Sequence, residues 1–227
     1  MDFELVNFEQ AARMARALAE VLRRHAQAAA APAAAAMLTG GTTVRPAYRR
    51  FAAAGPAPAP AGFYLLGSDE RHVPRTDDAS NYPVMAPVWQ ALALPPARIL
   101  MPDPSRPLAD AAARYHADLA AFFAAGGRIT LGLLGLGADG HVASLFTRED
   151  VERGRDNYAV AVPRPAPPDR VSVTPALLAR VELTIVLTAG PARRAALTRL
   201  LSGAADMPAV RALAGAPQVL LWHAARE

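Results

Sequence analysis

Apolar and polar positions follow a helical period in several long stretches of the chain. Residues 8–22 place apolar side chains at intervals of three to four residues, and Asn7 with Gln10 fits a capping pair before them. The longest predicted helix covers residues 105–125 and is ended by the glycines at 126–127. Two shorter helices are predicted at residues 44–54 and 191–201.

Short apolar runs of strand length lie between these helices. They cover residues 35–38, 63–67, 129–134, 158–162, 182–187 and 218–222. The proline-rich segment 55–62 is predicted to be a surface connector, because proline lacks the backbone donor that helices and central strands need. The repeated alternation of strand and helix predicts an α/β fold, with a mostly parallel, twisted, Rossmann-like sheet flanked by helices on both faces. The even spread of apolar segments predicts a single domain over residues 1–227.

Four polar or glycine-rich loops follow predicted strands. They are TGGTT at 39–43, SDERHVP at 68–74, GADGH at 137–141 and TAGPARR at 188–194. Because sites on parallel sheets form beyond the carboxyl ends of the strands, these loops are expected to meet at one edge. Glycine amides, threonine hydroxyls and arginines suit an anionic, hydroxylated small-molecule ligand.

Composition excludes several kinds of chemistry. The chain has no cysteine, and all 24 of its basic residues are arginines. Zinc-thiolate sites, cysteine nucleophiles, Schiff-base lysines and Walker-type phosphate lysines are therefore ruled out. The net charge is only +4 and the arginines are scattered, so no nucleic-acid partner is expected. No apolar run reaches membrane-spanning length, and residues 1–10 carry no basic segment before an apolar core; a cytoplasmic protein without membrane contact is expected.

Several of these motifs also have an ordinary structural interpretation. The charged run Asp69–Arg71 alone is typical of a solvated loop, and TGGTT alone fits a simple strand-to-helix turn. GLGADG at 135–140 matches a dinucleotide-binding pattern, but Asp139 would then face a pyrophosphate, so such a site is not expected. His141 follows an aspartate and glycines at a strand end, which favours a functional role.

Five segments resemble, in order, those of the 6-phosphogluconolactonases, relatives of the glucosamine-6-phosphate deaminases and isomerases. The segments are LTGGTT at 38–43, GSDERHVPRTDDASNY at 67–82, GLGADGHVASLF at 135–146, PPDRVSVT at 167–174 and GPAR at 190–193. The chain departs from the family pattern at Val44 and Thr147, which replace prolines, at Arg193, which replaces a lysine, and after Trp222, where an aspartate is missing. The deaminase branch has an Asn-Glu-Pro segment after the histidine loop, where this chain has Ser144, Leu145 and Phe146.

The resemblance implies the sugar-phosphate isomerase type of α/β fold and hydrolysis of 6-phospho-D-glucono-1,5-lactone, a step of the oxidative pentose phosphate pathway. It implies no metal and no cofactor, and the protein is expected to be a monomer or weak homodimer. An activated ester needs only a polarised carbonyl and a deprotonated water, and an imidazole changes protonation close to neutral pH. The residue roles that follow are His141 as general base, Asp139 as the group that orients it, Gly40, Gly41 and Arg71 for the oxyanion or sugar oxygens, Thr42, Arg170 and Arg193 for the phosphate, and Asp69 as a further substrate contact.

Two alternatives stay open. The first is a sugar-phosphate isomerase or deaminase that uses Asp69 as its enolising base. The second is a non-catalytic sugar-phosphate sensor, which would bind ligand without turnover.

Overall fold

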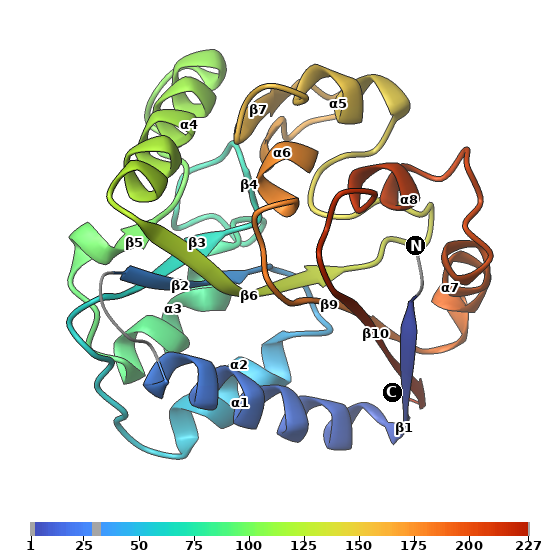
Figure 1. Cartoon of the computed structure of the whole chain (residues 1–227), viewed down its shortest axis with the longest axis horizontal. Coiled ribbons are helices and arrows are strands. Elements are labelled where there is room, and N and C mark those ends of the chain that lie inside the picture. Colours follow the sequence, from blue (N-terminus) through green and yellow to red (C-terminus); the bar gives the residue numbers. More distant parts are fainter. Residues whose placement is uncertain (1–2, 29–32, 227) are drawn as a thin grey trace.

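Seven parallel strands form the centre of the structure, a computed structural model that describes residues 3–28 and 33–226 (Figure 1). In sheet order the strands are β1 (Glu4–Gln10), β10 (Val219–Arg226), β9 (Thr184–Ala189), β6 (Gly127–Gly135), β2 (Ala33–Leu38), β3 (Phe63–Gly67) and β5 (Ile99–Leu100). Every neighbouring pair is parallel. The predicted parallel sheet is therefore confirmed.

Helices cover both faces of this sheet, as the alternating sequence pattern predicts (Figure 1). One face packs against α1 (Ala11–Gln27), α2 (Arg45–Ala53) and α3 (Tyr82–Ala91). The other packs against α4 (Leu108–Ala124), α5 (Arg148–Arg153), α6 (Pro175–Leu178), α7 (Arg194–Leu201) and α8 (Pro208–Ala212). Short 3₁₀ helices lie at Pro96–Arg98 and Pro191–Arg193. Within the described residues, none of the helices has the length and apolar character needed to span a bilayer.

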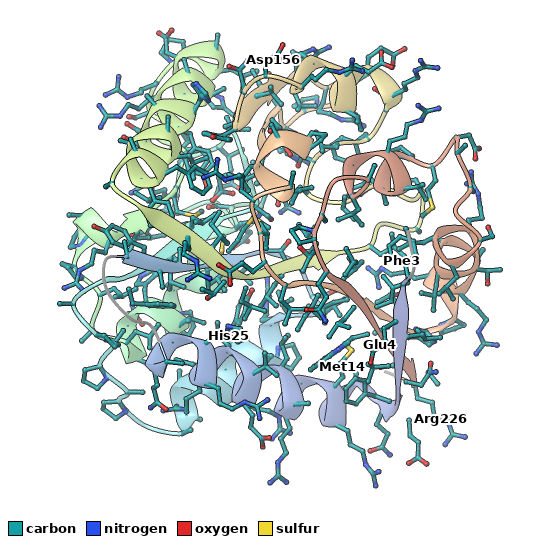
Figure 2. The ribbon with its side chains drawn as sticks, viewed as in Figure 1. Phe3, Glu4, Met14, His25, Asp156 and Arg226 are labelled. Carbon is teal, nitrogen blue, oxygen red and sulfur yellow. The ribbon has the colours of Figure 1, made fainter. Side chains whose placement is uncertain are left out.

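The central strand β2 shows why a fully buried strand reads as a continuous apolar run. Its alternate residues Ala35 and Met37 join the core beneath α4, whereas Ala36 and Leu38 join the core beneath α1 and α2. Met14 of α1 belongs to the second core, and its side chain extends from the helix toward the sheet (Figure 2).

A second, three-stranded antiparallel sheet lies beside the first, in the order β4 (Asp69–Arg71), β8 (Arg170–Val173) and β7 (Ala159–Val162). The chain passes from β3 into β4 through Ser68, whose N–H donates to Leu38 O and whose carbonyl accepts from Val173 N. The strand predicted at 158–162 is thus real, but it does not belong to the parallel sheet. The charged run Asp69–Arg71, which taken alone is typical of a solvated loop, instead forms β4 and pairs with β8.

The start of the chain also differs from the prediction. Residues 4–10 form an edge strand against β10, so the helix predicted from residue 8 begins only at Ala11. The expected Asn7–Gln10 capping pair is wrong, because Gln10 is the N-cap residue in an extended conformation and its side chain makes no capping hydrogen bond. Phe8 instead packs on Trp222, with ring centroids 5.0 Å apart. The cap predicted after the longest helix is supported by Gly126, whose φ is 81°.

Candidate active site

The four predicted loops meet at one edge of the sheet, because β9, β6, β2 and β3 are consecutive neighbours in it. Together the loops surround a cavity of about 180 Å³. Its lining comprises Thr39, Gly40, Gly41, Thr42, Thr43, Val44, Asp69, Arg71, Asn81, Gly135, Leu136, Gly137, His141, Ala143 and Arg193. The cavity therefore brings together all of the predicted site residues except Asp139, which contacts His141, and Arg170.

The loop after β2 is held tightly at the cavity wall. Gly41 has a φ of 98°, which favours glycine, and a Cβ on Gly40 would lie 1.8 Å from Asn81 Oδ1. Tyr48 on α2 donates a hydrogen bond from its hydroxyl to the carbonyl of Thr39 at 3.0 Å. The loop leads directly into the N-terminal end of α2, where the positive end of the helix dipole favours an anion.

The loop after β6 presents His141 with Asp139 beside it. Gly137 N–H donates to His141 O at 2.9 Å, and Gly140, with a φ of 90°, donates its N–H to Gly137 O at 3.0 Å. This tight turn brings His141 Nδ1 to 2.5 Å from Asp139 Oδ1. A Cβ on Gly137 would lie 2.3 Å from His141 Nδ1, so the pair requires glycine at that position. Because an ionised carboxylate only accepts hydrogen bonds, Nδ1 carries the proton when the imidazole is neutral, and Nε2 keeps its lone pair.

The Asp139 carboxyl is stabilised in its charged form by this arrangement. Its partial burial disfavours the charge, but the attraction and hydrogen bonds of His141 outweigh that effect and lower the pKa of Asp139. The side chain of His141 is 24% exposed, whereas that of Asp139 is 59% exposed. The ionised aspartate can therefore orient the imidazole and stabilise its protonated form.

Asp69 and Glu70 are buried, with 5% and 2% of their surfaces exposed. Asp69 accepts a hydrogen bond from Ser68 Oγ on one oxygen and from Ser144 Oγ on the other, each at 2.7 Å. Glu70 accepts from the backbone N–H groups of residues 71, 81 and 82 and from Ser80 Oγ. Burial raises the pKa of Glu70, although these hydrogen bonds oppose the shift. Glu70 thus holds the long loop that ends at α3.

The predicted arginines occupy different places. Arg71 borders the cavity and donates to Ala79 O, and Arg193 borders it from the loop after β9 and donates to Ala189 O at 3.4 Å. Arg170 lies opposite Arg71 in the β4–β8 pair, outside the cavity lining, and donates to the carbonyls of its own loop. Burial and the charge of Arg71 lower the pKa of Arg170. Among the described residues, none of these three arginines forms an ion pair, so no carboxylate lies in direct contact with their guanidinium groups.

Sequence reasoning did not single out Asn81 or Ser144. Asn81 borders the cavity and donates from Nδ2 to Asp69 O at 3.0 Å, and Ser144 binds the Asp69 carboxylate. Both lie within segments that resemble the family, and that was their only signal, because their partners are distant in sequence. In the part of the chain that the structure describes, no three His, Asp or Glu side chains gather closely enough to hold a metal ion.

Comparisons with known proteins show which family the chain is similar to. The family model described as glucosamine-6-phosphate isomerases/6-phosphogluconolactonase matches residues 9–222. A 6-phosphogluconolactonase from Homo sapiens is 31% identical over 219 residues, which cover 91% of this chain and 84% of that protein. One from Caulobacter vibrioides is 32% identical over 195 residues, which cover 81% of each.

Solved structures show the same fold. The 6-phosphogluconolactonase of Thermotoga maritima superposes with a TM-score of 0.77 at 23% identity, covering 98% of this chain and 100% of that one. A monomeric glucosamine-6-phosphate deaminase superposes with a TM-score of 0.73 at 17% identity, covering 97% of each chain. The fold is therefore shared by the lactonase and deaminase branches and does not by itself distinguish them. On the family match and the identity to its relatives, the chain belongs to the family of glucosamine-6-phosphate isomerases and 6-phosphogluconolactonases.

Proposed function

We propose that the protein hydrolyses 6-phospho-D-glucono-1,5-lactone to 6-phospho-D-gluconate by general-base activation of water. The observation that carries this proposal is the hydrogen-bonded Asp139–His141 pair, which stands at the same cavity as the glycine loop, Arg71 and Arg193. The names of the relatives support the choice of substrate.

In this mechanism His141 takes a proton from water at Nε2 while the water oxygen attacks the lactone carbonyl carbon. Asp139 holds the Nδ1–H and stabilises the imidazolium that forms. The bond between the carbonyl carbon and the ring oxygen then breaks, and the imidazolium returns its proton to the departing oxygen. This return of the proton leaves histidine neutral at the end of each cycle, and the new carboxylic acid ionises in water.

The other residues bind and stabilise. The backbone amides of Gly40 and Gly41 and the Arg71 guanidinium stabilise the negative charge that develops on the carbonyl oxygen. Thr42 and Arg193 bind the phosphate at the start of α2. We propose that the chain works as one domain, as a monomer or weak homodimer.

A sugar-phosphate isomerase or deaminase is the second candidate, because Asp69 borders the cavity and enolisation needs a carboxylate base. Each Asp69 oxygen, however, already accepts a hydrogen bond from a buried serine, which favours a role in holding the strand end. Release of ammonia from glucosamine 6-phosphate would identify this activity. A sensor would bind 6-phosphogluconate and open no lactone.

The decisive measurement is the rate at which the protein opens freshly generated 6-phosphoglucono-1,5-lactone, compared with the spontaneous rate. His141→Ala is expected to lower kcat by about two to four orders of magnitude, the usual contribution of a general base. A kcat near that of the wild type would refute the mechanism. Absence of any acceleration by the intact, folded protein would refute the function.

A further inference from the structure

The ring of His141 has a second support besides Asp139. It lies against Phe146, with ring centroids 4.3 Å apart and an interplanar angle of 46°. The guanidinium carbon of Arg164 lies over the Phe146 ring, 3.8 Å from its centroid. His141, Phe146 and Arg164 therefore form a continuous chain of contacts that begins at the cavity wall and ends on the loop between β7 and β8.

Phe146 is fixed through its backbone. Its N–H donates to Asp150 Oδ2 at 3.2 Å, and the same oxygen accepts from Thr147 N at 3.0 Å. Asp150 is buried and belongs to the capping box that starts α5. The Phe146 ring thus extends from a rigid helix start toward His141.

Arg164 is fixed by the loop that carries it. Its N–H donates to Asp169 Oδ1 at 2.7 Å, and Asp169 O accepts from His72 N at 2.8 Å, which ties the loop to the end of β4. Among the described residues, the Arg164 side chain makes no hydrogen bond and no ion pair. A guanidinium placed over an aromatic ring is attracted by it, so this contact favours the position of Arg164 on Phe146.

We propose that Phe146 and Arg164 are positioning residues for His141. They hold the imidazole in the plane in which Nδ1 meets Asp139 and Nε2 faces the cavity. Asp139 alone is a weak restraint, because its own side chain is 59% exposed and it touches the ring only at one edge. A displacement of about 1 Å in a reacting group can cost roughly a hundredfold in rate, so support for the face of the ring matters for turnover. This inference rests on the proposed function, with His141 as the base.

The test compares Phe146→Leu, Arg164→Met and Arg164→Lys with a matched control, Arg180→Met. Arg180 lies 4.4 Å over the half-buried ring of Phe123 on α4, away from the cavity, so the control removes the same kind of contact elsewhere. The measurements are kcat and KM for lactone opening, the midpoint of thermal unfolding, and the NMR signals of the His141 ring in ligand-free protein.

Phe146→Leu and Arg164→Met are expected to lower kcat by about tenfold and to leave KM within about twofold, because they misplace the base without touching substrate. Arg164→Lys should recover most of the activity, since an ammonium also binds an aromatic face. Arg180→Met should leave kcat unchanged. The His141 ring signals should shift in the two disruptive variants and stay in place in the control.

The proposal is overturned if Arg164→Met matches Arg180→Met in kcat and in the His141 signals. It is also overturned if Arg164→Met raises KM at unchanged kcat, which would make Arg164 a substrate ligand. Arg164 is partly exposed and Arg164→Met leaves the core intact, so this variant decides the question if Phe146→Leu fails to fold. If the wild-type protein opens no lactone, the proposed function fails and the NMR response alone decides the positioning role.

Discussion

Gly40→Ala tests how closely the glycine loop and Asn81 fit together. An added Cβ would lie 1.8 Å from Asn81 Oδ1 and 2.2 Å from Asn81 Cγ, so the carboxamide must move. Asn81 is 1% exposed, and its Nδ2 donates to Asp69 O at 3.0 Å. Overpacking costs about 1–3 kcal/mol, and loss of a buried hydrogen bond costs about the same. The substitution is therefore expected to lower the free energy of unfolding by about 2–6 kcal/mol.

Urea and thermal unfolding measure this loss. For a chain of this length, each kcal/mol corresponds to about 2–4 °C, so the unfolding midpoint should fall by roughly 4–24 °C. Gly135→Ala is the matched control, because Gly135 also borders the cavity but a Cβ there meets no atom within 4 Å. Gly41→Ala separates backbone strain from contact, since its φ is 98° and its surroundings are open; a cost of about 1–2 kcal/mol is expected.

The cause is identified by repeating Gly40→Ala in an Asn81→Ala background. Without the carboxamide the new methyl group has room, so in this background Gly40→Ala should lower the free energy of unfolding by less than about 0.5 kcal/mol. An equal cost of Gly40→Ala in both backgrounds would refute the argument from contact with Asn81. A cost no greater than that of Gly135→Ala would refute it as well.

Three further predictions concern charged residues. Arg193→Met should raise KM for the lactone, because Arg193 borders the cavity. Arg170 lies outside the cavity lining, so Arg170→Met should leave KM near the wild-type value. Similar changes of KM in both variants would contradict the assignment of Arg193 as a phosphate ligand. Glu70→Gln should lower the free energy of unfolding in urea by about 2–4 kcal/mol, because an amide cannot accept from all four donors that the carboxylate binds, and an unchanged midpoint would contradict this role. Burial of Asp139 disfavours its charged form, but His141 outweighs this effect and lowers the pKa of the carboxyl. The stability that this interaction contributes is therefore present above the ordinary carboxyl pKa. It is lost as the pH falls through the lowered pKa of the folded state. Asp139→Asn should therefore be less stable than the wild type near neutral pH and match it in acid, and a difference independent of pH would contradict the prediction.

The parallel sheet could be predicted because its central strands are buried on both faces and read as apolar runs. The edge strand β1 could not, because most of its residues are exposed and only Val6 and Phe8 mark its inner face. The strand Asp69–Arg71 reads as a loop because it is short and charged. Its carboxylates are satisfied by groups such as Ser144, 75 residues away, and no local pattern reveals such partners.

The place of the site followed from the topology, since polar loops after parallel strands meet at one edge. The roles of individual residues came from the resemblance to a family and not from periodicity. Arg170 lies in a matching segment, yet it belongs to strand β8 opposite Arg71 and outside the cavity lining, a position that the sequence pattern does not reveal. Asn81 shows the converse, because its position depends on Glu70 and on the glycine loop together.

The pairing of β1 with β10 sets the order in which the sheet can be completed during synthesis. Residues 4–10 find their partners only at residues 220–226, at the other end of the chain (Figure 1). Closing so long a loop is entropically costly and makes this contact one of the most non-local in the fold. While the ribosome is still translating the chain, β1 has no partner strand and its backbone groups stay open to other chains. The outermost pair of the sheet therefore forms only after translation has passed β10. Any truncation that removes β10 also leaves β1 without a partner strand.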